Sequence, residues 1–128
     1  MRIAELKAEF EGATTLDGYQ DVGRRSVEII LGAVKLVWDP GLVAAGESPP
    51  KGDDAKAKFD IILSASAPGK SHEELRSLLR AAWRLGHDTK HSGHADRLSA
   101  FCSAQAAVLI ARSLQEIQAQ QKRHASDF

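Results

Sequence analysis

The sequence predicts an all-α fold, a single-domain bundle of about five helices. Apolar residues recur at spacings of three and four along several long segments, as they do on the buried face of a helix. Glycine and proline gather between these segments, and no two segments pair convincingly as β-strands. The 128 residues, 43% of them hydrophobic, are enough for one domain with its own core.

The first part of the chain contains two expected helices. Residues 2–10 form a short helix with one apolar face. The second begins at Asp17 or Asp21, both candidate caps, and runs to about Trp38. Asp39-Pro40-Gly41 ends it, because proline lacks the N–H that a helix uses. Length and apolar spacing favour a helix over a strand here, in spite of several β-branched residues.

A loop and a third helix follow. Residues 40–53 are rich in glycine and proline, so we expect a mobile loop there. Asp53 or Asp54 then caps a helix that ends before Pro68-Gly69.

The fourth helix begins at a capping box formed by Ser71 and Glu74. Gly86 is its expected end, and Ser92-Gly93 is a second break. Its apolar side comprises Leu75, Leu78, Leu79, Ala82 and Trp83. Its opposite side carries three arginines at four-residue spacing, Arg76, Arg80 and Arg84.

The last helix begins near Ala95 or Asp96 and runs to about Gln121, and residues 119–128 read as a frayed polar tail. Its alanines allow another helix to approach closely. Its expected apolar stripe is Leu98, Phe101, Ala104, Val108, Ala111 and Leu114, widened by Ile110 and Ile117.

Composition limits the classes of partner and compartment. Seventeen basic and seventeen acidic residues balance, so any nucleic-acid binding must come from a local patch. Zero net charge also weakly favours self-association. The single cysteine, Cys102, excludes an intrachain disulfide framework and fits a reducing compartment. No apolar run approaches the roughly 20 residues of a membrane span, and no signal-peptide core is present, so we expect a cytoplasmic protein.

The segment Trp83–His94 concentrates the residues that could carry chemistry. It contains three histidines, an aspartate, an arginine and a lysine, and six residues separate Arg84 from His91. An arginine can bind a phosphate oxygen, and a histidine can move the proton of an RNA 2′-hydroxyl. Together they suffice in outline for RNA cleavage without a metal. The alternative is a polar turn with a solvated arginine.

Two other kinds of site stay open for this segment. On a continuous helix His87, His91 and His94 would face one way and could bind Zn²⁺, although the glycine breaks argue against it. The pair His87-Asp88 resembles that of HD-type phosphohydrolases, for which only Asp127 follows as a distant aspartate.

The segment from Arg84 to Gly93, followed by a long alanine-rich helix, resembles the HEPN superfamily and within it the abortive-infection C-terminal type. That pattern has an arginine, six residues, and a histidine followed by small residues. Upstream, the run from Gly23 to Glu28 resembles the Arg-x-x-x-Glu start of an early helix in such domains. The likeness covers about residues 18–118.

This resemblance implies a helical homodimer. Many members are endoribonucleases of toxin–antitoxin, abortive-infection or other defence systems that need no metal or cofactor, and others have lost catalysis. Arg84 and His91 match the catalytic positions. Asp88 or Glu28 would orient the histidine, and a dimer would bring two copies of the motif into one cleft.

The chain departs from the motif at Leu85, where asparagine, aspartate or histidine is usual. Either His87 or Asp88 supplies this polar function, or the site is inactive. In an active protein, Arg76 and Arg80 would position the RNA substrate; otherwise they are a solvated helix face. The competing function is a non-catalytic dimerisation or interaction module, antitoxin-like or accessory to a defence system.

Overall fold

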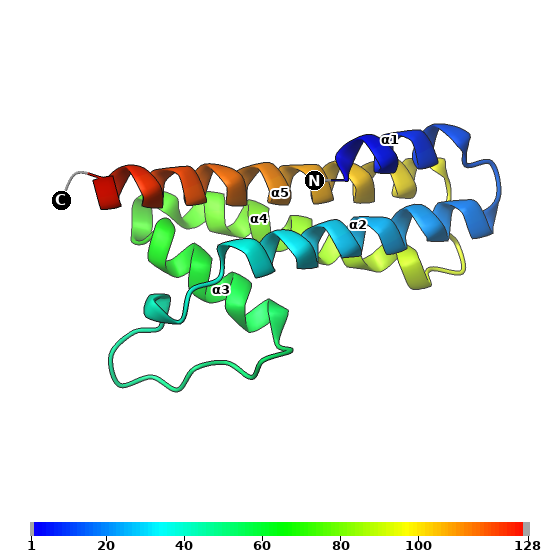
Figure 1. Ribbon diagram of the computed structural model, residues 1–128. Helices are drawn as coiled ribbons and strands as arrows, with labels where there is room; N and C mark the ends of the chain where they lie inside the picture. The colour runs from blue at the N-terminus through cyan, green and yellow to red at the C-terminus, as the bar shows by residue number, and fades with distance from the viewer. Residues whose placement is uncertain (1, 127–128) are drawn as a thin grey trace.

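The computed structural model describes residues 2–126, and this part of the chain contains five α-helices and no strand, which confirms the all-α class (Figure 1). The α-helices are α1 (Ile3–Gly12), α2 (Leu16–Val37), α3 (Ala55–Ser66), α4 (Glu73–Asp88) and α5 (Arg97–Ser126). Three single-turn 3₁₀ helices join them, η1 (Pro40–Leu42), η2 (Lys70–His72) and η3 (Thr89–His91). No described helix has both the length and the apolar character needed to cross a membrane.

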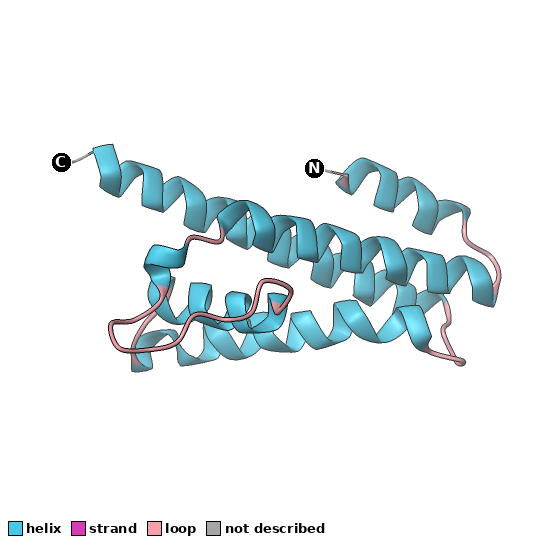
Figure 2. Cartoon of the chain, turned by 60° about the horizontal axis from the view of Figure 1, so that its bottom comes forward, coloured by secondary structure: helices cyan, strands magenta, loops and turns pink. Residues whose placement is uncertain are grey.

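Three long helices, α2, α4 and α5, lie side by side and form the centre of the bundle (Figures 1 and 2). The short helix α1 packs on both α2 and α5, and α3 packs against α2 beside α4. The largest fully buried hydrophobic side chains are Leu6, Val22, Ile30, Val34, Phe59, Ile62, Leu63, Ile110 and Leu114. Every α-helix except α4 contributes to this set, and α4 adds Leu79, Ala82 and Trp83.

The inner side of α5 is lined with small residues, as its alanine content predicts. Ala100, Ala107 and Ala111 are fully buried there. Leu98, however, belongs to the predicted stripe and is 70% exposed, and Phe101 is also exposed. Both lie in the first turns of α5, and the ring of Phe101 packs against the ring of Phe10 of α1 at 5.7 Å between centroids.

The prediction that Gly86 ends the fourth helix is wrong, since α4 continues through it to Asp88. Gly86 is buried against α2, where a Cβ atom would lie 2.5 Å from the Ile30 Cδ1. Gly23 of α2 has the same function towards η3, because a Cβ there would lie 2.4 Å from the Lys90 amide nitrogen. The two glycines let α2 approach α4 and η3 closely.

Helix starts differ from the prediction at two places. Thr15, rather than Asp17 or Asp21, caps α2, and its Oγ1 accepts a hydrogen bond from the Gly18 amide at 3.1 Å. The capping box at Ser71 and Glu74 does not form, because residues 70–72 make the 3₁₀ turn η2 and α4 begins at Glu73.

Helix α5 begins at Arg97 with Asp96 before it as a cap, which agrees with the expected start near Ala95 or Asp96. The α3 prediction is confirmed, with Asp54 accepting from the Ala57 amide at 3.1 Å. At its other end α5 extends beyond the expected residue 121 to Ser126.

Candidate functional site

Arg84 and His91 lie at the end of the bundle where α4 passes directly into η3. Both side chains are exposed, and neither forms a hydrogen bond, ion pair or ring contact with the described chain. Because α4 continues past Gly86 and passes into η3, the seven-residue step from Arg84 to His91 spans about two helical turns, a rise of about 10 Å. Seven residues return nearly to the same side of a helix, so both groups face one surface.

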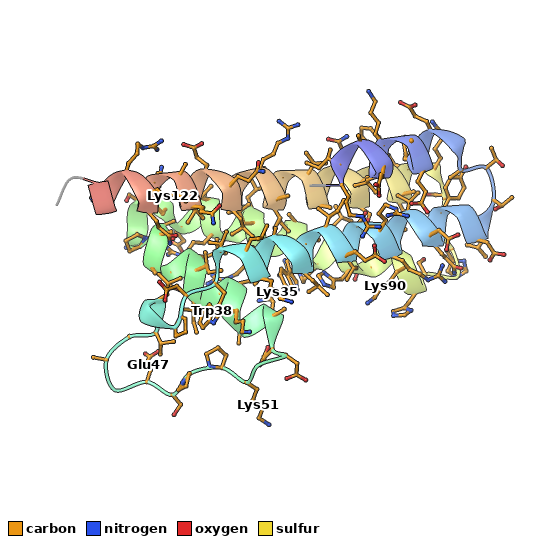
Figure 3. All side chains as sticks on the ribbon, in the orientation of Figure 1. Lys35, Trp38, Glu47, Lys51, Lys90 and Lys122 are labelled. Carbon is orange, nitrogen blue, oxygen red and sulfur yellow. The ribbon has the colours of Figure 1, made fainter. Side chains whose placement is uncertain are left out.

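The η3 turn is held from two sides. Thr89 is buried, and its Oγ1 donates to the Ser99 carbonyl oxygen of α5 at 3.3 Å. Gln20 of α2 donates through Nε2 to the Ser92 carbonyl oxygen at 3.0 Å. Gly23 lies directly against the backbone of the turn. The backbone that carries His91 is therefore fixed, whereas its side chain faces solvent; Figure 3 labels the neighbouring Lys90 at this end.

These supporting residues were missed by the sequence reasoning. Gln20, Thr89 and Ser99 have no motif of their own, and their contacts join parts of the chain that are distant in sequence. The one available signal was Gly23, a glycine inside a long helix, which often marks a close backbone approach.

Asp96 fixes the start of α5, the helix that holds Thr89. Its Oδ1 accepts from the Ser99 amide at 2.8 Å, while the Ser99 Oγ accepts from the Asp96 amide at 2.9 Å. The hydrogen bonds from Ser99, the backbone one foremost, lower the pKa of the Asp96 carboxyl group below its ordinary value. This reciprocal cap links the start of α5 to the position of η3.

His87 turns inward instead of joining His91. Its ring stacks on the buried Trp83 at 4.7 Å between centroids, and Trp83 stacks in turn on Phe59 of α3. The Nδ1 atom lies 2.7 Å from the Trp83 carbonyl oxygen. A carbonyl oxygen only accepts hydrogen bonds, so Nδ1 carries the proton of this contact.

The three-histidine zinc site of the alternative interpretation is not formed. No group of three or more histidine, cysteine, aspartate or glutamate side chains in residues 2–126 is placed to hold a metal ion. His87 is committed to Trp83, and His94 follows the break at Ser92-Gly93. Asp127, the distant aspartate of the HD-type alternative, lies outside the described residues.

The two acidic candidates for orienting His91 lie in different places. Asp88 is exposed on α4, four residues after Arg84 and so next to it on the helix surface. Glu28 faces α1, where its carboxylate lies 3.3 Å from the Arg2 Nη1 and 4.0 Å from the Arg25 Nη1. Arg25 also pairs with Glu9 of α1, and this hydrogen bond raises the pKa of the guanidinium group.

Arg76 and Arg80 are engaged with α3. The Arg76 Nη1 donates to the carbonyl oxygens of Ala67 and Gly69 at 2.6 and 2.7 Å, just beyond the end of α3. The Arg80 Nε donates to the Asp60 Oδ1 at 3.3 Å. Of the three arginines at four-residue spacing, only Arg84 forms no hydrogen bond, ion pair or ring contact in the described chain.

Apolar side chains lie on the outer surface of α4 beside Arg84. Leu78 and Leu85 are 54% and 40% exposed, and Leu75 is exposed as well. Leu78 and Leu85 are seven residues apart and therefore lie on one side of the helix. We call Leu75, Leu78 and Leu85 the leucine strip of α4, and in the single chain all three remain exposed to solvent.

Comparison of the chain with models of known protein families, with curated proteins and with solved structures found no match in any of the three.

Proposed function

We propose that the protein is a metal-independent endoribonuclease of the HEPN type, with Arg84 and His91 as its catalytic residues. The observation that carries this proposal is an unengaged arginine and an unengaged histidine on one exposed surface, above a turn that the rest of the bundle holds in place. The resemblance of the segment from Arg84 to Gly93 to the HEPN motif supports it independently. The same resemblance suggests a role in a toxin–antitoxin or phage-defence system.

Each residue has a defined role in the proposed reaction. The Arg84 guanidinium binds the oxygens of the scissile phosphate and stabilises the charge that develops there. His91 removes the proton of the 2′-hydroxyl, whose oxygen attacks phosphorus and displaces the 5′-oxygen. The leaving oxygen takes a proton from an imidazolium group. The products are a 2′,3′-cyclic phosphate and a 5′-hydroxyl.

Asp88 is our candidate for the polar function that Leu85 does not supply. It lies beside Arg84 on α4, whereas Glu28 is paired with arginines on the α1 side of α2. His87 acts indirectly in this proposal, since its contacts with Trp83 stiffen the end of α4.

We also propose that the protein is a homodimer through the outer face of α4. Exposed leucines that form a strip on one helix side are typical of an interface. Covering Leu78 and Leu85 with a second copy would place Arg84, the neighbour of Leu85, at the edge of the contact. Two copies of the motif would then lie near one cleft and supply one imidazole as base and another as acid.

The test is incubation of the purified protein with RNA in EDTA. We expect cleavage that leaves 2′,3′-cyclic phosphate and 5′-hydroxyl ends. His91→Ala should lower the rate by about 100-fold or more, a typical contribution of general acid–base catalysis. His124→Ala is the matched control, because His124 is an exposed histidine near the far end of α5. An unchanged rate in His91→Ala, or products with 5′-phosphate ends, would count against the proposal.

A non-catalytic interaction module is the second candidate, and the exposed leucines of α4 favour it equally. Here the protein would dimerise or bind an antitoxin-like or defence partner without cleaving RNA. Sedimentation tests this face as a dimer interface, because Leu78→Glu should convert a dimer into a monomer. If the wild type dimerises but leaves RNA intact, the interaction module is the better account.

A further inference from the structure

Lys90 differs from the other half-buried lysines of the protein. In the part of the chain that the structure describes, three lysines are half-buried, Lys56, Lys58 and Lys90. The Lys56 Nζ donates to both carboxylate oxygens of Asp60 at 2.9 Å, and the Lys58 Nζ donates to the Gly52 carbonyl oxygen at 2.8 Å. Lys90 forms no hydrogen bond, ion pair or ring contact with the described chain. Of these three lysines, it alone has an ammonium group without a partner.

The backbone of Lys90 is held against α2. A Cβ atom added at Gly23 would lie 2.4 Å from the Lys90 amide nitrogen and 2.9 Å from its Cα. The hydrogen bond from Thr89 to Ser99 holds the preceding residue of η3. A half-buried lysine packs its methylene stem and leaves the ammonium group in water. Because the backbone and the stem are both packed, the ammonium group is confined to one region of this end of the bundle, where Figure 3 labels Lys90.

The neighbouring carboxylates do not neutralise this charge. Asp21 and Glu28, the acidic residues of α2 on either side of the contact with η3, are both paired with arginines. Asp88 lies two residues before Lys90, and residues two apart on a helical turn do not face each other. The positive charge of Lys90 is therefore available to an anion from outside the chain.

Lys90 reaches a different place from Arg84 and His91. Neighbouring residues of a 3₁₀ turn point about 120° apart, so the Lys90 side chain is turned away from the direction of His91. It lies next to the surface that Arg84 and His91 share, without being part of it. A phosphate bound by Lys90 is therefore a neighbour of the phosphate bound by Arg84.

We propose that Lys90 binds the phosphate of a nucleotide that flanks the cleaved bond, so that the substrate is an RNA strand longer than the two nucleotides which this bond joins. The inference rests on the proposed cleavage by Arg84 and His91. Lys90 is a positioning residue, since it holds the strand and does not touch the reacting atoms. An ammonium group binds phosphate as a point charge, so this contact is independent of the base sequence.

Lys90→Met tests this contact, because methionine keeps an unbranched apolar stem and removes the charge. The probe is a fluorescent 2′-O-methyl RNA strand of about ten nucleotides, which lacks the attacking hydroxyl group and so resists cleavage. In fluorescence anisotropy we expect Lys90→Met to bind this strand about fivefold more weakly than the wild type. The slope of log K against log salt should fall in magnitude by about 0.7, the share of one phosphate contact on a single strand.

Cleavage kinetics separate positioning from catalysis. On an unmodified strand of about ten nucleotides, Lys90→Met should raise KM about fivefold with the same kcat, as expected when a contact is equally strong in the ground state and the transition state. On a ribodinucleotide, whose one phosphate is the phosphate that is cleaved, the difference in kcat/KM between Lys90→Met and the wild type should disappear.

Lys90→Arg should restore binding, and Lys35→Met is the matched control, because Lys35 is an exposed lysine near the other end of α2 (Figure 3). Circular dichroism verifies that each variant is folded. Wild-type affinity and salt slope in Lys90→Met overturn the assignment. An equal loss in Lys35→Met, or no saturable binding to the wild type up to about 1 mM protein, overturns it as well.

The same measurements distinguish failure of this inference from failure of the proposed function. If the wild type cleaves RNA and Lys90→Met changes neither KM nor the salt slope, the assignment of Lys90 is wrong and the nuclease proposal stands. If the wild type leaves RNA intact but binds the 2′-O-methyl strand, and Lys90→Met weakens that binding, the phosphate contact stands and the nuclease proposal is wrong.

Discussion

The two halves of α4 use the same residue type in opposite ways. In the first half Arg76 and Arg80 donate to α3 and to the residues just beyond its end. In the second half Arg84 forms no hydrogen bond, ion pair or ring contact with a described group and lies close to η3 in the sequence. Four residues advance a helix by about 400°, so each arginine is turned by about 40° from the one before. The Arg84 side chain is therefore turned by about 80° from that of Arg76, and it faces solvent instead of α3.

This difference separates a structural arginine from a candidate catalytic one. Partial burial and hydrogen bonding make Arg76 and Arg80 contribute to the stability of the fold. An exposed arginine without a partner adds little to stability and is free to bind a phosphate. Substitutions should therefore change stability in the first half of α4 and activity in the second.

The largest effect on stability should come from the contact between Gly23 of α2 and η3, the turn that follows the second half of α4. In Gly23→Ala the new Cβ would lie 2.4 Å from the Lys90 amide nitrogen and 2.8 Å from the Thr89 carbonyl carbon. Because these are backbone atoms, α2 and η3 must move apart, and we expect the free energy of unfolding to fall by about 2–3 kcal/mol. Urea denaturation measures this change.

Gly86→Ala is the control for that measurement. Its added Cβ would lie 2.5 Å from the Cδ1 atom of Ile30, the terminal atom of a buried side chain and not a backbone atom. We expect a change within about 1 kcal/mol, because the gain in helix propensity offsets part of the clash. Equal losses in the two variants would show that α2 does not rest on the backbone of η3.

An intermediate effect is expected in the first half of α4. Arg76→Ala removes two hydrogen bonds from a charged donor to the carbonyl oxygens of Ala67 and Gly69. We expect a loss of about 1–2 kcal/mol in the free energy of unfolding. Arg84→Ala should change it by less than about 0.5 kcal/mol, as is usual for an exposed side chain without contacts. A loss of unfolding free energy in Arg84→Ala as large as that in Arg76→Ala would contradict the proposed difference between the two halves of α4.

The fold class and most helix ranges follow from the sequence, because apolar periodicity and strong breakers are local signals. Asp54 as a cap and the break at Ser92-Gly93 belong to this group. Gly86 was misjudged as a helix end because its function depends on Ile30, a residue of another helix. The capping box at Ser71 does not form, because the 3₁₀ turn η2 occupies residues 70–72 and α4 begins at Glu73.

The motif predicts the position of the candidate site, but it does not predict which polar residues of α4 are held by structural contacts. The motif singles out Arg84, but the regular spacing of the three arginines does not reveal that Arg76 and Arg80 bind α3 and the residues just beyond its end. The inward turn of His87 likewise depends on Trp83 being buried against Phe59. Tertiary contacts decide which polar residues of a helix remain available.

The smallest expected effect on stability comes from the Asp96 cap at the start of α5, the helix that accepts a hydrogen bond from Thr89 of η3. Folding lowers the pKa of Asp96, so its ionised form stabilises the folded chain. This contribution is complete above the pKa of the unfolded chain, about 3.9, and is lost as the pH falls through the lower pKa of the folded state. Asp96→Ala should lower the melting temperature by a few degrees near pH 7.

The melting-temperature difference between wild type and Asp96→Ala should shrink below about pH 4. Asp53→Ala is a suitable comparison, because Asp53 is exposed and its side chain caps no helix in the described chain. A difference that grows on acidification would have the wrong sign for this cap.

The most direct test of the contrast within α4 is the rate of RNA cleavage in EDTA by Arg84→Ala and Arg76→Ala, each corrected for its folded fraction. We predict a fall of about 100-fold or more for Arg84→Ala, the usual result of removing a donor that stabilises developing charge. Arg76→Ala should stay within about threefold of the wild type. Equal rates in the two variants, or a greater loss in Arg76→Ala, would contradict the assignment of Arg84 as the catalytic arginine.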